Sequence, residues 1–181
     1  MIRKTLSGVG ALGLSLAASV PAWAQEAAEA AEPVANPGNN AWMMTATVLV
    51  LLMIIPGLTL FYGGLTRSKN MLSTMTQIGA TACLAMLIWV LWGYSLAFGD
   101  TTYEGTLGLF ISGGSYFLAG TDASSTAATF TDEVISKYVF ISFQMTFAAI
   151  TAALILGATA ERMKFSAVMA FVPIWLTIVY F

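Results

Sequence analysis

Four long apolar segments divide the chain, and most polar residues gather in the stretches between them. The segments cover residues 42–65, 71–98, 138–160 and 165–181. A helix rises about 1.5 Å per residue and needs about 20 apolar residues to cross a bilayer, a length that the first three segments exceed. The pattern predicts an all-α fold, a polytopic bundle of transmembrane helices.

The fourth segment continues to the last residue, Phe181, through the sequence VPIWLTIVYF. A transmembrane helix normally ends in polar residues that reach the membrane surface, and this one has none. We therefore expect the chain to be the N-terminal part of a longer protein.

Composition supports insertion into a lipid bilayer. Of 181 residues, 58% are hydrophobic and only 9% are charged, so lipid must cover much of the folded surface. The seven basic residues are scattered and form no patch, which excludes a nucleic-acid partner.

The first residues have the features of a secretory signal. Arg3 and Lys4 precede a short apolar stretch at 9–20 and an A-x-A sequence at 22–24, which predicts a cleaved signal peptide over 1–24. The alternative, an uncleaved first span, would need a longer apolar stretch to cross the bilayer.

A polar stretch separates the signal from the first apolar segment. Residues 25–40 are rich in Ala and Glu and end near Pro37-Gly38, which predicts a disordered periplasmic tail. The remaining residues, 41–181, hold the four apolar segments and form the membrane domain.

Basic residues mark the two short connections between apolar segments. Arg67 and Lys69 lie in the first connection, and Arg162 and Lys164 lie in the second. The long connection, 99–137, instead contains five acidic residues and one lysine. Short loops rich in Lys and Arg remain in the cytoplasm, so we expect a multi-pass protein of the bacterial inner membrane with its mature N-terminus outside.

Several residues are predicted to shape the helix ends. Pro56-Gly57 lies inside the first segment, where proline removes an N–H donor and bends the helix; it is either a tolerated kink or a ligand site. Gly63-Gly64 allows the first helix to end, and Asn70 or Ser73 is predicted to cap the second.

The third segment contains an unusual group of side chains for a lipid-facing helix. Phe143 and Phe147 are four residues apart and are expected to stack along one helix face, with Gln144 and Thr146 beside them. An unpaired amide is costly in lipid, so Gln144 should face protein or a water-filled path. The rings either pack against a neighbouring helix or line a permeation route, where they attract a cation and exclude water.

The sequence lacks the usual groups of an intramembrane enzyme. It contains no histidine, one cysteine (Cys83), and no acidic residue inside the four apolar segments. A disulfide within the chain, a cysteine metal site and a nucleophile paired with a base are therefore excluded, so we expect neither an enzyme nor a cofactor or metal.

Three motifs together resemble the ammonium transporter family. They are FYGGLTRSKN at 61–70, WGYSLAFG at 92–99 and FQMTFAAITAALILGATAERMKFSAV at 143–168. They occur in the order of the family, and the resemblance extends from about 41 to 181.

The resemblance implies a channel-like transporter of eleven helices, of which this chain holds the first four. It also implies two inverted repeats around a central hydrophobic pore and a homotrimer. Phe147 matches the inner phenylalanine of the pore gate, and Phe143 matches the outer one near the ammonium recruitment site. Gln144 occupies the matching position beside them, and Tyr180 matches a tyrosine of unassigned role.

Other parts of the family's pore are missing from this sequence. The resemblance places two histidines, a tryptophan, an aspartate and the second gate phenylalanine after Phe181. We therefore expect the complete protein to take up ammonium, ammonia or methylammonium, and the chain alone to be inactive. A regulatory protein of the PII class is the partner that the resemblance implies for the cytoplasmic turns. The alternative function is a membrane anchor or structural subunit without transport activity.

Overall fold

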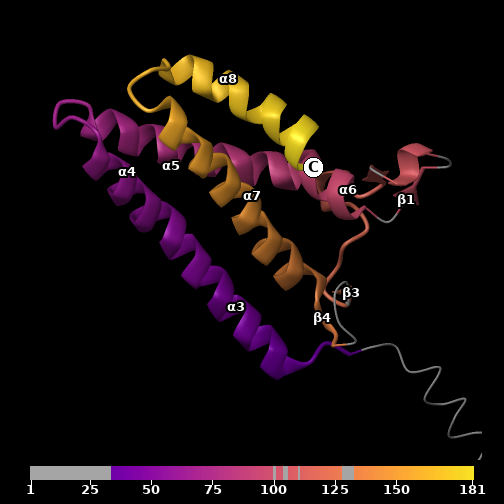
Figure 1. Cartoon of the computed structure of the whole chain (residues 1–181). Coiled ribbons are helices and arrows are strands. Elements are labelled where there is room, and N and C mark those ends of the chain that lie inside the picture. Colours follow the sequence, from indigo (N-terminus) through magenta and orange to yellow (C-terminus); the bar gives the residue numbers. More distant parts are fainter. Residues whose placement is uncertain (1–33, 100, 104–105, 110, 128–132) are drawn as a thin grey trace, which may run out of the picture. The chain divides into compact units, whose positions relative to one another are not determined.

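The computed structural model describes residues 34–99, 101–103, 106–109, 111–127 and 133–181, and the predicted signal peptide at 1–24 lies outside them. The chain divides into two compact units, Met1–Val34 and Ala35–Phe181. Every helix and strand described below belongs to the second unit, which Figure 1 shows as long helices coloured from indigo to yellow.

The first span joins three helical segments: α3 (Pro37–Leu52), the π-helical turn η1 (Met53–Leu58) and α4 (Thr59–Leu65). The span begins at Pro37, ahead of the expected start at 42, and runs for 29 residues. Asn36 explains the earlier start, because its side-chain oxygen accepts hydrogen bonds from the backbone N–H groups of Gly38 and Asn39. The predicted disordered tail over 25–40 is therefore wrong for its last four positions, which are helical.

Polar side chains at the start of α3 have partners that the sequence pattern did not reveal. Asn39 Nδ2 donates to Glu133 Oε2 at 2.7 Å, and Asn40 Oδ1 accepts a hydrogen bond from the backbone N–H of Ser136 at 2.9 Å. These bonds tie the start of α3 to the segment that precedes α7 (Lys137–Thr159).

Pro56 disturbs the first span without ending it. The proline lies inside η1, where the wider π-helical turn accommodates a residue that cannot donate a backbone hydrogen bond. The hydroxyl of Thr59 donates to the carbonyl oxygen of Ile54 at 3.3 Å and supports this turn. The disturbance expected at Pro56-Gly57 thus takes the form of a π-helical turn.

The second span consists of α5 (Met71–Ile88), the π-helical turn η2 (Trp89–Gly93) and α6 (Tyr94–Phe98). Asn70 occupies the position before α5, but no side chain caps this helix. The amide of Asn70 instead donates to the carboxylate of Glu161, 3.0 Å away. The prediction that Asn70 or Ser73 caps the second helix is therefore wrong, because a distant carboxylate binds the Asn70 side chain.

The remaining helices are α7, α8 (Phe165–Trp175) and the π-helical turn η5 (Leu176–Tyr180). By length and composition, three described helices are suited to cross a membrane: Pro37–Leu65, Met71–Phe98 and Lys137–Thr159. The helix over Phe165–Tyr180 is apolar but shorter.

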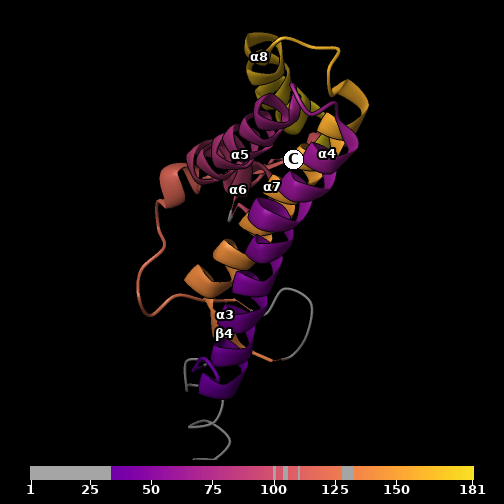
Figure 2. The same cartoon turned by 90° about the vertical axis from the view of Figure 1, so that its left-hand side faces the viewer.

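The second span packs against most of the other helices. Helix α5 contacts α4, α7 and α8, and α3 runs along α7 (Figures 1 and 2). The core between these helices contains fully buried alanines, which let helix backbones approach closely. They include Ala82, Ala85, Ala149, Ala152 and Ala153.

Two π-helical turns also meet in the core. A Cβ atom on Gly93 of η2 would lie 2.5 Å from Cζ of Phe181, so glycine is needed for this ring to fit. Trp92 Nε1 donates to Thr177 Oγ1 at 3.0 Å, and Thr177 Oγ1 donates to the carbonyl oxygen of Pro173 at 2.8 Å. These contacts fix η5 against the second span.

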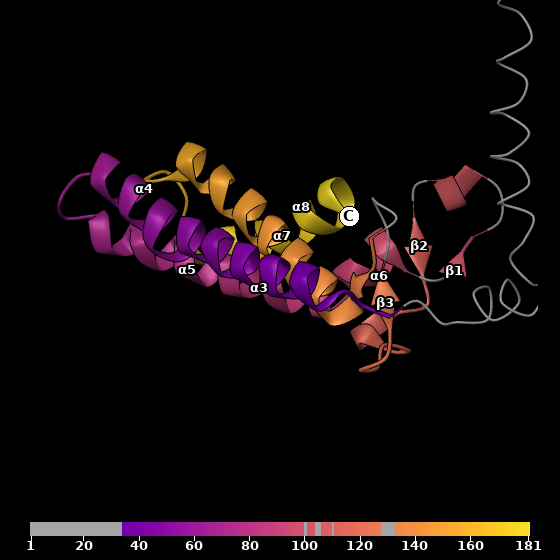
Figure 3. The ribbon, with the colours of Figure 1, turned by 90° about the horizontal axis from the view of Figure 1, so that it is seen from below.

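The described parts of the long connection between α6 and α7 form two short antiparallel strand pairs and two 3₁₀ turns. The pairs are β1 (Thr101–Thr102) with β2 (Ser112–Gly113), and β3 (Thr126–Ala127) with β4 (Ile135–Ser136); the turns are η3 (Thr106–Leu109) and η4 (Tyr116–Leu118). In register, Thr101 pairs with Gly113, and Thr126 pairs with Ser136. Figure 3 shows the strands at the end of the molecule where α6 ends and α7 begins.

The two short basic connections lie side by side at the other end of the helices. The backbone N–H of Arg67 and Nδ2 of Asn70 each donate to Oε1 of Glu161 at 3.0 Å. Both turns can therefore occupy one membrane face, as the predicted topology requires. The predicted fold class, a polytopic helical membrane fold, is confirmed.

Candidate functional site

Helix α7 has one packed face and one open face. Residues of the packed face are at most 3% exposed and contact the core; they include Ile141, Ala148, Ala152 and Leu156. Successive residues of an α-helix are turned by about 100°, so positions 143, 147, 154 and 158 share the opposite side. We call this side, formed by Phe143, Phe147, Leu154 and Ala158, the open face of α7. Phe147 is 38% exposed and Leu154 is 49% exposed.

The two phenylalanines of the open face contact each other. Their ring centroids are 5.0 Å apart and the ring planes are inclined by 65°, an edge-to-face arrangement. The two rings expected along one face of the helix thus meet edge to face, an arrangement that the ring quadrupole favours because it places a positive edge against a negative face. The pair presents both ring edges and ring faces beside α7.

Gln144 follows Phe143 on the same helix and is half-buried. Within the part of the chain that the structure describes, no side-chain hydrogen bond of Gln144 is formed. An amide has two N–H donors and one oxygen acceptor. Gln144 thus keeps a polar group beside the aromatic pair, available to a partner outside the described residues.

The hydroxyl groups near the pair are satisfied within α7 itself. Thr146 Oγ1 donates to the carbonyl oxygen of Phe143 at 2.6 Å, and Thr151 Oγ1 donates to that of Phe147 at 2.7 Å. Both threonines therefore fit a membrane helix without an external partner, and the open face remains mainly apolar.

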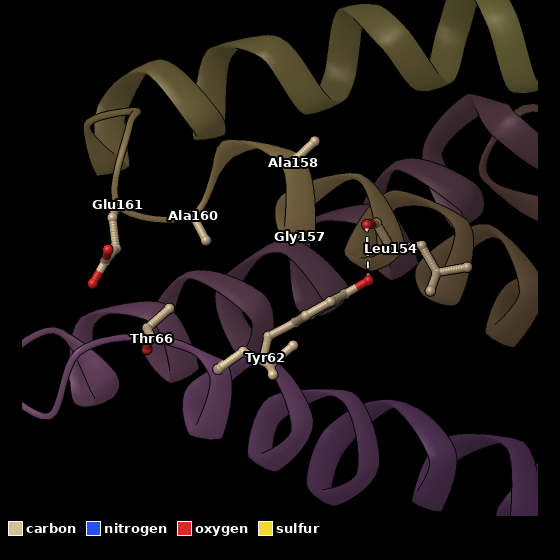
Figure 4. Close-up of a pocket in the computed structure, with 8 residues that line it drawn as sticks. Tyr62, Thr66, Leu154, Gly157, Ala158, Ala160 and Glu161 are labelled. Atoms are coloured by element: carbon tan, nitrogen blue, oxygen red, sulfur yellow. Dashed lines mark hydrogen bonds between the residues drawn. The ribbon is translucent and has the colours of Figure 1, made fainter.

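A cavity of about 360 Å³ adjoins the same face nearer the end of α7 (Figure 4). The residues that line it come from α4, α7 and the turns that follow them: Tyr62, Leu65, Thr66, Leu154, Gly157, Ala158, Ala160 and Glu161. Leu154 and Ala158 belong both to the open face and to this lining. Two positions of the open face thus help to line the cavity.

Tyr62 crosses the space between α4 and α7. Its hydroxyl donates to the carbonyl oxygen of Leu154 at 3.1 Å, the bond drawn in Figure 4. The ring lies against Gly157, where a Cβ atom would come within 2.7 Å of Tyr62 Cε1. Glycine at 157 therefore permits the contact between these two helices.

Glu161 lies at the mouth of the cavity and is exposed. The pKa of its carboxyl group is lowered, first by the hydrogen bond from the Asn70 side chain and next by the bond from the Arg67 backbone. The nearby charges of Arg67 and Lys69 act in the same direction. Glu161 is therefore ionised at neutral pH.

Phe143, Gln144 and Phe147, the three site residues expected from the sequence, lie within two turns of α7. Tyr62 and Glu161 were not expected at the site, although they lie within the motifs at 61–70 and 143–168. Neither motif alone carries a signal for these two residues, because their contacts join segments more than 90 residues apart.

The described residues offer little for metal chemistry. Among them, no group of three or more His, Cys, Asp or Glu side chains lies close enough to hold a metal ion. The chemistry available on the open face is instead that of aromatic rings and one amide, which suits a small cation or a small neutral molecule.

Comparison with known proteins agrees with these features. The family model described as Ammonium Transporter Family matches residues 41–181. A putative ammonium transporter of Methanothermobacter thermautotrophicus is 43% identical over 145 residues, which cover 80% of this chain and 34% of that protein. An ammonium transporter of Bacillus subtilis is 37% identical over 150 residues, which cover 79% of this chain and 33% of that protein.

Solved structures give the same result. The crystal structure of Candida albicans Mep2 superimposes with a TM-score of 0.67 and 34% sequence identity, over 81% of this chain and 30% of that one. Saccharomyces cerevisiae Mep2 gives a TM-score of 0.61 and 30% identity. The chain spans about a third of the length of the relatives it matches. On this evidence the resemblance is confirmed, and the chain belongs to the ammonium transporter family.

Proposed function

We propose that the protein takes part in the transport of ammonium across a membrane, and that the open face of α7 forms one wall of the route. The observation that carries the proposal is the contact between Phe143 and Phe147 on a face that the described helices leave open. The relatives named above are ammonium transporters, a class of transporter and not of enzyme.

The aromatic pair supplies attraction without strong binding. A phenyl face attracts a desolvated cation by about 1 to 2 kcal/mol, far less than a carboxylate would in the same place. Ammonium would thus be recruited near Phe143, transfer its proton to water or to a relay outside this chain, and pass Phe147 as ammonia. Gln144 provides an amide beside the route for the polar substrate.

Selectivity follows from the same apolar surface. Potassium has no proton to lose, so it would have to enter the apolar segment as an ion and lose its hydration without compensation. Methylammonium keeps an ionisable N–H group and should follow ammonium. A carboxylate-lined route would not make this distinction.

The protein is a multi-pass membrane protein, and we propose that the mature N-terminus lies outside the bacterial inner membrane. The turns that contain Arg67 and Arg162 lie side by side, so both would face the cytoplasm. The connection between α6 and α7 would then lie outside, near the end of α7 that bears Phe143. This orientation places Phe143 on the outer side and Phe147 on the inner side.

The route needs a second wall, which the family resemblance assigns to further helices. We propose that the complete pore has eleven helices, belongs to a homotrimer, and is inactive when only the present four segments are supplied. A PII-type regulator would dock on the cytoplasmic turns. The open face of α7 supports the first part of this proposal, because it leaves apolar side chains exposed beside the aromatic pair.

Uptake measurements test the function directly. Bacterial cells that lack their own ammonium transporters would express the complete gene to which this chain belongs, with an empty vector as control. We expect saturable uptake of labelled methylammonium that ammonium inhibits and potassium does not. Membrane insertion without any such uptake would favour the alternative of a structural subunit or anchor.

A further inference from the structure

Polar contacts tie α4 and α7 together on both sides of the cavity. On the membrane side, the hydroxyl of Tyr62 binds the carbonyl oxygen of Leu154. At the mouth, Glu161 Oε1 accepts hydrogen bonds from the backbone N–H of Arg67 and from Nδ2 of Asn70, both at 3.0 Å. The cavity of about 360 Å³ lies between these contacts.

The backbone of Glu161 adopts a conformation that is unusual for its side chain. Its φ angle is +62°, in the left-handed region that glycine or asparagine normally occupies after a helix. A glutamate at this position has no conformational advantage. Its two hydrogen bonds to the turn before α5 provide a reason for a carboxylate here.

The contacts of Glu161 link segments that are distant in sequence. Arg67 and Asn70 precede it by 94 and 91 residues. Both partners belong to the turn between α4 and α5, so the bonds restrain the end of α4 relative to the end of α7. Leu154 and Ala158, which line the cavity between them, also belong to the open face that bears the aromatic pair.

We propose that Glu161 is a positioning residue that fixes the width of this cavity, and that the cavity is the inner mouth of the route for ammonia and methylamine. The inference rests on the proposed function, because only a conducting protein needs an inner mouth. Glu161 acts through the turn that it holds and does not bind the substrate. Loss of the carboxylate would let the end of α4 move toward α7 and narrow the cavity, which slows exit without altering recruitment near Phe143.

The substitution Glu161→Ala tests the proposal, with Glu161→Gln and Arg162→Ala as controls. Glutamine keeps an oxygen that can accept both hydrogen bonds, and Arg162 is an exposed neighbour in the same turn. We expect Glu161→Ala to lower the maximal rate of methylammonium uptake by about threefold or more with an unchanged KM, the size of effect known for residues that act at a distance. Both controls should behave as the unaltered protein.

The partner residue gives a second test that does not depend on transport. Asn70→Ala should lower thermal stability in the membrane, and the combination with Glu161→Ala should be no worse than Glu161→Ala alone. Additive effects of the two substitutions would show that the bonds are not coupled and would overturn the proposal.

The outcomes separate the two claims. Absence of uptake by the unaltered protein refutes the proposed function and, with it, the role of an inner mouth. If Glu161→Ala leaves uptake unchanged, or raises the KM with an unchanged maximal rate, the positioning role of Glu161 is overturned and the proposed function is not. An effect of Glu161→Gln as large as that of Glu161→Ala also overturns it.

Discussion

The phenol of Tyr62 rests on the backbone of Gly157 and donates its hydroxyl to the carbonyl oxygen of Leu154, 3.1 Å away. The contact joins two helices that are far apart in sequence, and it depends on the absence of a side chain at position 157. A methyl group there would meet the ring at 2.7 Å, inside normal contact distance.

We predict that Gly157→Ala destabilises the protein by about 1 to 3 kcal/mol, because the Tyr62 ring cannot move aside without losing its bond to Leu154. Gly79→Ala is the matched control. It lies in α5 with no atom within 4 Å of the added methyl group, so alanine should be neutral or stabilising by up to about 1 kcal/mol. Melting temperatures in detergent would compare the two variants. Equal destabilisation by both would contradict the importance of the Tyr62 contact.

The two phenylalanines should have separable effects on uptake. Phe143→Leu keeps an apolar side chain but removes the ring, so it should raise the KM for methylammonium by roughly tenfold, the equivalent of about 1.4 kcal/mol of lost cation attraction. Phe147→Ala should widen the apolar segment and reduce discrimination against potassium. Kinetics of uptake, with and without potassium, would distinguish these results. If neither variant differs from the unaltered protein, the pair serves packing alone.

The isolated chain should not transport ammonium. Its open face would meet lipid, and the Gln144 amide would lie there unpaired, at a cost of several kcal/mol. The purified 181-residue chain in liposomes should show no more methylammonium flux than empty vesicles. A saturable flux that Phe147→Ala abolishes would prove that these helices suffice.

The proposed topology predicts which turn an impermeant reagent can reach. Ser68 is exposed in the turn between α4 and α5, next to Arg67 and Lys69. A cysteine introduced by Ser68→Cys, in a Cys83→Ala background, should resist labelling in intact cells and react after permeabilisation. Ser124→Cys, in the connection between α6 and α7, should react in both cases. The reverse pattern would invert the orientation.

The contacts of Glu161 should persist at all physiological pH values. Hydrogen bonds, and then the charges of Arg67 and Lys69, lower the pKa of the Glu161 carboxyl group in the folded protein. The ionised carboxylate therefore stabilises the fold fully at any pH above the ordinary pKa of glutamate. This stabilisation is lost as the pH falls through the lowered pKa of the folded protein. The stability difference between the unaltered protein and Glu161→Gln should therefore be constant from pH 8 to 5 and change only below about pH 4. Melting curves over this range would measure it. A change between pH 5 and 8 would disprove the ionised contact.

Sequence patterns predicted those features of the molecule that depend on the spacing of residues within one helix. Phe143 and Phe147 could be placed on one face because α7 is a continuous α-helix with a four-residue interval between them. The partners of Asn70 and Asn39 could not be predicted, since each lies more than 90 residues away in sequence. The cavity beside Tyr62 likewise depends on how two helices pack and has no signature in either helix alone.

The π-helical turn η1 has a consequence for every residue that follows it in the first span. Such a turn holds one residue more than an α-helical turn, so each later residue faces about 100° away from the direction that an uninterrupted α-helix would give it. Tyr62 comes after η1, and its direction toward α7 depends on that wider turn. If Met53–Leu58 wound as a regular α-helix with every residue kept, the phenol would turn away from Leu154. Deletion of one residue from this segment would instead remove the wide turn and leave the phenol facing α7. The π-helical winding of Met53–Leu58, rather than any single side chain in it, thus determines where the phenol points.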